Sequence, residues 1–214
     1  MSTPSATGFC VLVPVKPSAR AKSRLAPLGD EARRDLATAL AVDTVTAALS
    51  SPAVGAVLVV TDDHVLAGLM SRVGAHVVPD GAADDLNESL RQAAFEARRR
   101  WPDLSPAALC ADLPALDADD LTAALEVAVH HDAAFVADAD GVGTTMLAAA
   151  SADDLLPRFG PDSRARHADD GAHEIVEVDV PTLRRDVDTP EDLRTALALG
   201  AGERTRLAAT GLRL

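Results

Sequence analysis

Residues 9–15 read Phe-Cys-Val-Leu-Val-Pro-Val, an apolar run that ends where the basic stretch 16–24, Lys-Pro-Ser-Ala-Arg-Ala-Lys-Ser-Arg, begins. The run is too short for a buried helix and is rich in valine, so it predicts a strand that is buried on both faces. Residues 30–49 follow with apolar side chains at helical spacing, and strand-length runs then alternate with helical patterns along the chain. This alternation predicts βαβ units and therefore a mostly parallel sheet.

The pattern predicts an α/β fold with one doubly wound, mostly parallel sheet in a single domain of residues 1–214, with a core of 9–199. A small insertion is expected near 141–180, and a helical or frayed tail over 201–214. The expected strands are 9–15, 54–60, 75–78, 107–111, 133–137, 143–149 and 174–178. The expected helices are 30–49, 63–73, 86–100, 118–130, 151–159, 161–169 and 189–199. Ligands of such folds bind at the carboxyl ends of the strands, where the strand order reverses.

The composition excludes several classes of protein. A net charge of -13 and only five aromatic residues argue against a nucleic-acid-binding protein. No apolar run reaches the roughly 20 residues that cross a bilayer, and no basic residue precedes the first apolar segment as in a secretory signal. Two cysteines cannot form a disulfide framework, so we expect a cytoplasmic protein. Its oligomeric state stays open, with a homo-oligomer as one option.

The basic residues are unevenly distributed. Residues 1–29 carry four basic side chains and no acid, a charge of +4, whereas the other 185 residues carry -17. Both lysines of the chain, Lys16 and Lys22, lie in this segment with Arg20 and Arg24. Such a loop favours an anion site suited to a polyphosphate, although a solvated basic loop is the simpler alternative. It matches neither the Gly-x-x-x-x-Gly-Lys nor the Gly-x-Gly-x-x-Gly phosphate-binding pattern.

Three carboxylates follow expected strands or open an expected helix. Asp112 comes directly after the strand 107–111, and Asp117 and Asp119 lie closer to the next helix as caps. Asp186 and Asp188 are one residue apart, so both point the same way if the backbone is extended. Because magnesium needs only one or two carboxylates beside substrate phosphates and water, Asp112 with Asp186 or Asp188 would suffice. The alternative is that these residues only cap helices.

Asn87, the only asparagine, opens the expected helix 86–100. Its side chain either caps that helix or hydrogen-bonds a base or ribose, and the sequence leaves both readings open.

Four segments in combination resemble the guanylyltransferases of coenzyme F-420 biosynthesis, which belong to the nucleotidyltransferase superfamily. They are Val-Pro-Val-Lys at 13–16, Ala-Lys-Ser-Arg-Leu at 21–25, Asp-Leu-Pro at 112–114 and Asp-Val-Asp-Thr-Pro-Glu-Asp-Leu at 186–193. The resemblance covers about residues 9–199 and implies a Rossmann-like nucleotidyltransferase fold. One departure is Asp85-Leu86-Asn87, where relatives often read Gly-Leu-Asn.

The resemblance implies a GTP-dependent enzyme that uses Mg2+ to activate a phosphorylated three-carbon acid. We expect Lys22 and Asp112 to be catalytic, and Asp112, Asp186 and Asp188 to bind the metal. GTP is expected to contact Lys16, Lys22, Ser23, Arg24 and Asn87. The matching positions for the acid are Thr145, Gly160 and Ser163, with Thr144 as an alternative to Thr145.

The expected reaction is transfer of GMP from GTP to phosphoenolpyruvate with release of pyrophosphate. 2-Phospho-L-lactate is the alternative acceptor. The Ala- and Arg-rich, Lys-poor composition is typical of a high-GC bacterium, and the bacterial members of the family that the chain resembles are associated with phosphoenolpyruvate, which favours that acceptor. More distant alternatives are a molybdenum-cofactor nucleotidyltransferase, a nucleotide-sugar glycosyltransferase and a non-catalytic nucleotide-binding module.

Overall fold

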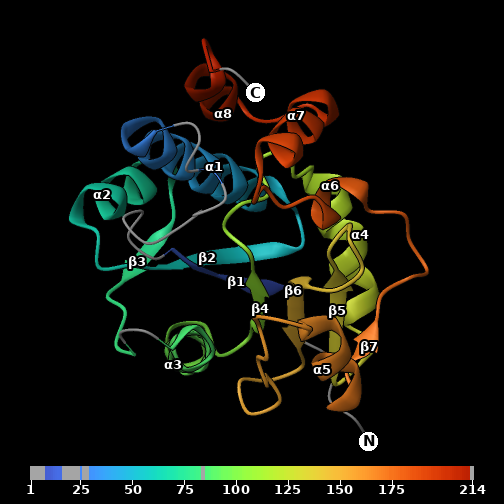
Figure 1. Ribbon diagram of the computed structural model, residues 1–214. Helices are drawn as coiled ribbons and strands as arrows, with labels where there is room; N and C mark the ends of the chain where they lie inside the picture. The colour runs from blue at the N-terminus through green and yellow to red at the C-terminus, as the bar shows by residue number, and fades with distance from the viewer. Residues whose placement is uncertain (1–7, 16–24, 26–28, 83–84, 213–214) are drawn as a thin grey trace, which may run out of the picture.

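The computed structural model describes residues 8–15, 25, 29–82 and 85–212. Figure 1 shows the strands in a central layer with helices above and below it. The strands are β1 (Phe9–Pro14), β2 (Val54–Val60), β3 (His76–Val78), β4 (Ser105–Leu109), β5 (Ala133–Ala137), β6 (Thr144–Ala149) and β7 (His173–Glu174). The helices are α1 (Asp30–Ser50), α2 (His64–Val73), α3 (Leu86–Arg100), α4 (Ala118–Ala128), α5 (Ser163–Asp169), α6 (Pro181–Arg184), α7 (Pro190–Leu199) and α8 (Glu203–Ala209).

The seven strands form one sheet in the order β3-β2-β1-β4-β6-β5-β7. β1 pairs in parallel with both β2 and β4, so the strand order reverses between β1 and β4. Among the strands that the structure describes, only β6 runs antiparallel to its neighbours, β4 and β5. The prediction of an α/β fold with a mostly parallel sheet is confirmed, and the segment 141–180 supplies β6 to the interior of that sheet.

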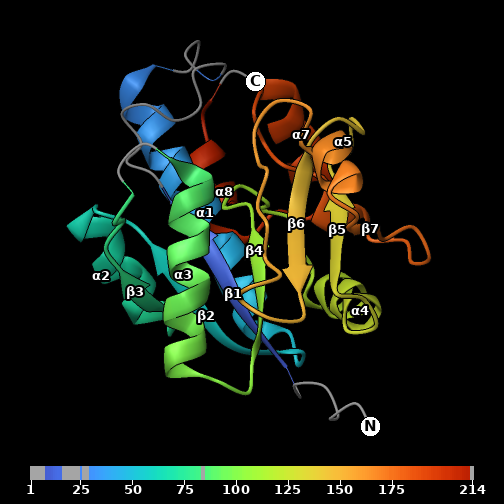
Figure 2. The ribbon, with the colours of Figure 1, turned by 90° about the horizontal axis from the view of Figure 1, so that it is seen from below.

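Two apolar layers cover the faces of the sheet. Alternate residues of β1 and β2 pack against α1, α2, α4 and α6 on one face. The intervening residues pack against α3 and against the loop that contains Leu155 and Phe159 on the other face. Figure 2, seen from below, places α3 in front of the sheet. The alternation follows from the period of two of a strand, and it explains why residues 9–14 are apolar throughout.

A third apolar cluster joins the two ends of the chain at the edge where β1 ends. Leu25 and Leu36 pack with Val187 and Leu193, and all four side chains are fully buried. The expected tail contains α8, whose first N–H groups bond to Asp43 of α1, as in the 2.7 Å bond from Thr205 N to Oδ2. The cluster brings the segment that carries Asp186 and Asp188 against the start of α1.

Most expected elements lie within two residues of the observed ones, and 54–60, 86–100 and 133–137 agree at both ends. The expected helix 151–159 was wrong. Pro157 interrupts it, and the N–H groups of Arg158 and Phe159 donate to side chains instead, those of His167 and Asn87. The expected strand 174–178 is reduced to β7, because the Val176 N–H donates to the side chain of Glu177. α6 was not expected.

Within the described residues, no helix is both long enough and apolar enough to span a bilayer.

Candidate functional site

The carboxylates of Asp112, Asp186 and Asp188 converge at the edge of the sheet where β1 and β4 end. Each offers one oxygen, these three oxygens lie within 4.8 Å of one another, and all three residues are partly buried. Asp112 follows β4, whereas Asp186 and Asp188 lie between α6 and α7. A set of carboxylate oxygens fits a hard divalent cation such as Mg2+ or Mn2+. The structure therefore brings together the three residues that are predicted from the sequence to bind the metal.

Main-chain hydrogen bonds hold the two acidic segments together. The N–H of Val187 donates to the carbonyl oxygen of Asp112 over 3.0 Å. The Val187 side chain is fully buried in the third cluster, which anchors the residue between the two aspartates. The side chain of Val187 is thus buried, whereas each of its neighbours Asp186 and Asp188 places a carboxylate oxygen within 4.8 Å of one from Asp112.

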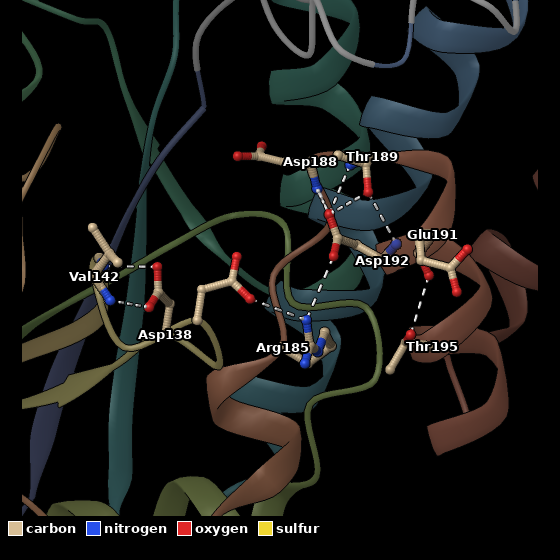
Figure 3. A network of polar contacts seen from close by, with 10 residues as sticks. Asp138, Val142, Arg185, Asp188, Thr189, Glu191, Asp192 and Thr195 are labelled. Atoms are coloured by element: carbon tan, nitrogen blue, oxygen red, sulfur yellow. Dashed lines mark hydrogen bonds and ion pairs between the residues drawn. The ribbon is translucent and has the colours of Figure 1, made fainter.

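Asp192 of α7 stabilises the loop that carries Asp188. Its Oδ2 accepts hydrogen bonds from the N–H of Asp188 and from the N–H and hydroxyl of Thr189, at 3.2, 2.8 and 2.7 Å. Thr189 in turn accepts from the Asp192 N–H, so the two residues form a capping box. Figure 3 shows Asp192 at the centre of these bonds and the Asp188 side chain directed away from it.

The pKa of Asp192 reflects two opposing effects. Burial raises it, but the hydrogen bonds from Thr189 and Asp188 and the charge of Arg185 hold the pKa of Asp192 below its usual value. Arg185 Nη1 lies 3.4 Å from Asp192 and 4.0 Å from Asp140. Arg185 thus lies between α7 and the turn that precedes β6.

That turn is built around Asp138. Its carboxylate accepts the N–H groups of Val142 and Gly143 at 2.9 and 2.8 Å, as Figure 3 shows for Val142. A Cβ at Gly143 would lie 2.4 Å from Asp138 Oδ2, so a side chain there would displace the carboxylate that holds the turn. The turn delivers the chain into β6 at the edge of the sheet where β4 ends.

Thr145 lies beside the residues that lead to Asp112. Because β6 is antiparallel, its first residues meet the end of β4, and the Cys110 N–H donates to the Thr145 carbonyl over 2.8 Å. Thr145 is also the extra residue of a bulge, since Val136 pairs with Met146 and Ala137 with Thr144. Bulges redirect side chains near functional sites. The Thr145 hydroxyl bonds to the carbonyl of Val136 over 3.4 Å, and the residue is 1% exposed.

Gly160 and Ser163 lie in the segment that leads into α5. The backbone of Gly160 has φ +118°, a conformation that side chains disfavour. The Ser163 N–H donates to the Gly160 carbonyl over 3.2 Å, and Ser163 is buried.

Asn87 contacts this same segment. Its side-chain oxygen accepts the Phe159 N–H at 2.8 Å, and its amide donates to the Phe159 carbonyl at 3.2 Å. Asp85, at the departure from the family pattern, caps α3 by accepting the N–H groups of Asn87 and Glu88. Asp85 is thus the N-cap of α3, and the Asn87 side chain instead binds the backbone of Phe159, the residue before Gly160.

His167 joins the Thr144 and Arg158 segments. Its Nε2 lies 2.9 Å from the backbone N–H of Arg158, which is always a donor, so this nitrogen is unprotonated. In the neutral ring, Nδ1 then carries the proton and donates to the Thr144 hydroxyl over 2.9 Å. Burial lowers the pKa of His167 to about 4, with Asp170 opposing the shift and Arg158 and Arg166 adding to it. The ring is therefore neutral near pH 7.

Four predicted nucleotide-binding residues, Lys16, Lys22, Ser23 and Arg24, lie outside the described residues. The residues on either side of this stretch are described. Val15 donates its N–H to Val60 at the end of the sheet, and Leu25 is buried with Val187.

The sequence did not nominate Asp192 or His167. The spacing Thr-x-x-Asp at 189–192, which is typical of a capping box, was the available signal for Asp192. No local pattern marks His167, because its partners lie in two other segments.

Residues 9–213 match the family model described as guanylyl transferase CofC like. A protein of Streptomyces avermitilis named phosphoenolpyruvate guanylyltransferase is 52% identical over 205 residues, 95% of each chain. A protein of the same name from Thermomonospora curvata is 50% identical over 197 residues, 92% of this chain and 86% of that protein. Among solved structures, a nucleotidyl transferase from Methanothermobacter thermautotroptrophicus matches with a TM-score of 0.60 at 22% identity, over 90% of this chain and 98% of that one.

Proposed function

The chain belongs to the family of CofC-like guanylyl transferases, and we propose that it transfers GMP from GTP to phosphoenolpyruvate in coenzyme F-420 biosynthesis. It is a nucleotidyltransferase, as its family shows. The relatives that are about half identical to it and carry the name phosphoenolpyruvate guanylyltransferase support this acceptor. 2-Phospho-L-lactate, which differs by two hydrogen atoms, is the alternative acceptor.

One observation carries the proposal: the main chain that leads to Asp112 is hydrogen-bonded to Thr145 on one side and to the segment 186–188 on the other. Cys110, two residues before Asp112, donates its N–H to Thr145, and Val187 donates to Asp112 itself. The residues proposed for the metal and Thr145, which is proposed for the acceptor, therefore lie on segments that are directly hydrogen-bonded to each other.

Asp112, Asp186 and Asp188 would hold Mg2+. When bound, the ion neutralises negative charge on the triphosphate. We propose that Lys16, Lys22, Ser23 and Arg24 bind the phosphates of GTP. Val15 and Leu25, the described residues on either side of this stretch, lie at this edge of the sheet. A segment of charge +4 in an acidic protein would attract a triphosphate to this edge.

Thr145, Gly160 and Ser163 are proposed to bind the acceptor acid. A phosphate oxygen of the acceptor attacks the α-phosphorus of GTP, forming a new P–O bond. The bond from that phosphorus to the oxygen bridging to the β-phosphate breaks, and pyrophosphate leaves with the electron pair. Because the attacking oxygen is already ionised at neutral pH, no general base is needed, and catalysis comes from positioning and charge stabilisation.

The direct test supplies the protein with GTP, Mg2+ and either phosphoenolpyruvate or 2-phospho-L-lactate, and measures pyrophosphate and product mass. We expect pyrophosphate with phosphoenolpyruvate and a product with the mass of enolpyruvoyl-diphospho-guanosine. Release with 2-phospho-L-lactate alone would assign the alternative acceptor. Lack of product with either acid would reject the proposed reaction.

We place the reaction in the cytoplasm. The two cysteines of the chain, Cys10 and Cys110, are not joined by a disulfide, and this supports a reducing compartment.

A further inference from the structure

Thr44 of α1 makes hydrogen bonds on both sides of Asp112. Its hydroxyl lies 3.2 Å from the Ala111 carbonyl oxygen and accepts the Leu113 N–H over 3.0 Å. It also lies 2.9 Å from the Leu40 carbonyl of its own helix. The side chain is 0% exposed.

These contacts exceed what a threonine within a helix ordinarily makes. Such a hydroxyl usually donates to the carbonyl four residues earlier, as Thr46 does to Val42 over 2.7 Å. A hydroxyl has one proton and two lone pairs. Thr44 uses this capacity to accept from Leu113 and to share its proton between Leu40 and Ala111.

The backbone around Asp112 needs such partners because it has left the sheet. The ladder of β4 ends at Leu109, with one more bond from Cys110 to Thr145. A buried main-chain group without a hydrogen-bond partner lowers the stability of the fold. The Thr44 hydroxyl therefore supplies hydrogen bonds to the main chain beyond the end of the strand. Val187 holds the Asp112 carbonyl from the other side.

We propose that Thr44 is a positioning residue that fixes Asp112 so that its carboxylate meets Asp186 and Asp188 in a geometry that binds a divalent cation. The inference rests on the proposed metal role of these three carboxylates and concerns a residue that does not itself touch the ion. Residues that orient metal ligands typically change metal affinity by about 10- to 100-fold when they are replaced.

The test compares Thr44→Val with Thr46→Val. Both substitutions replace a hydroxyl by a methyl of similar size and remove a bond to the carbonyl four residues earlier, but only Thr44→Val removes the bonds to residues 111 and 113. Mn2+ binding to the substrate-free protein is measured from the electron paramagnetic resonance signal of the free ion. We expect the Mn2+ dissociation constant to rise about 10- to 100-fold in Thr44→Val and to stay unchanged in Thr46→Val. Thr44→Ser should restore tight binding.

Unfolding curves of the variants separate positioning from general stability. A purely structural role predicts a lower melting temperature with an unchanged Mn2+ dissociation constant for folded Thr44→Val, and that result would overturn the proposal. Absence of Mn2+ binding to the unsubstituted protein would overturn it too. Should Thr44→Val not fold, Thr44→Cys carries the same comparison, because a thiol is a weak donor and acceptor. The Mn2+ binding assay contains neither GTP nor an acceptor, so its result does not depend on whether the protein catalyses the proposed reaction. A failure of that reaction and a failure of this inference can therefore be distinguished.

Discussion

The N–H of Val187 donates to the carbonyl oxygen of Asp112, so a main-chain hydrogen bond joins the two acidic segments. Replacing one carboxylate therefore leaves this bond in place. The role of each carboxylate can therefore be tested by substitution while the main-chain hydrogen bond that joins the two segments is kept.

Asp112→Asn should reduce kcat by on the order of 10²- to 10³-fold, because the neutral amide is a poor ligand for a hard cation and the phosphates lose charge stabilisation. The free energy of unfolding should change little. Asp103→Asn, at an exposed position before β4, is the control and should retain full activity. Equal turnover in the two variants would remove Asp112 from the mechanism. Steady-state pyrophosphate release measures the effect.

Lys22→Ala should cost transfer far more than folding, because it removes a charge proposed to bind the triphosphate. Arg204→Ala removes the same charge from an exposed position on α8 and serves as the control. The comparison uses kcat/KM for GTP together with the melting temperature. If Lys22→Ala matches Arg204→Ala in both, the basic segment is a solvated loop.

Asn87→Asp separates two roles for Asn87. The carboxylate cannot donate to the Phe159 carbonyl and would repel it, which should displace the segment before Gly160. If Asn87 positions that segment, KM for phosphoenolpyruvate should rise about 10-fold while KM for GTP stays constant. A rise confined to the KM for GTP would instead support the nucleotide contact expected from the sequence. Glu88→Gln, on the next residue, is the control.

Asp192→Asn should weaken both the α7 cap and the Asp188 loop, since a neutral oxygen makes weaker bonds to the N–H groups of Asp188 and Thr189. We expect a loss of about 1 kcal/mol in unfolding free energy and weaker Mn2+ binding. Glu191→Gln, in the same first turn with a largely exposed side chain, should change neither. Chemical denaturation and Mn2+ titration measure the two effects.

His167 predicts a specific acid sensitivity. As pH falls from about 6.5 to about 4, the unfolded state gains a proton at His167 while the folded state does not, so folding stability decreases. The pKa difference corresponds to roughly 3 kcal/mol, and below about pH 4 this contribution no longer changes. His167→Gln should lose this component of the pH dependence, whereas exposed His64→Gln should retain it. Unfolding free energies of the three proteins across this pH range test it, and parallel curves for all three would contradict it.

The elements that the sequence predicts well are those with local patterns. The helix from Asp30 has regular apolar spacing, and β2 is a continuous apolar run. The expected strand 107–111 is displaced toward the N-terminus: β4 begins at Ser105, and Ala111 is apolar but bonds to Thr44 of α1 rather than to a neighbouring strand. This partner is distant in sequence, so no local pattern could show it.

The same distinction applies to the site. Convergence of Asp112 with Asp186 and Asp188 could be anticipated, because the end of a strand and the Asp-x-Asp spacing are visible locally. The pairing of Asn87 with Phe159 could not, because it joins a side chain to the backbone of a distant segment. For the helix 151–159, Pro157 was a local signal against a continuous helix.

The reversed direction of β6 has a consequence for how such an enzyme can change its acid substrate. Since β5 and β6 form a hairpin, residues 133–149 are one uninterrupted stretch that enters and leaves the sheet without a crossover. An exchange of this hairpin between relatives would transplant Thr145 and its bulge in a single piece, leaving Asp112, Asp186 and Asp188 in place. If Thr145 binds the acceptor as proposed, this part of the acceptor site can therefore change without a change in the metal-binding aspartates.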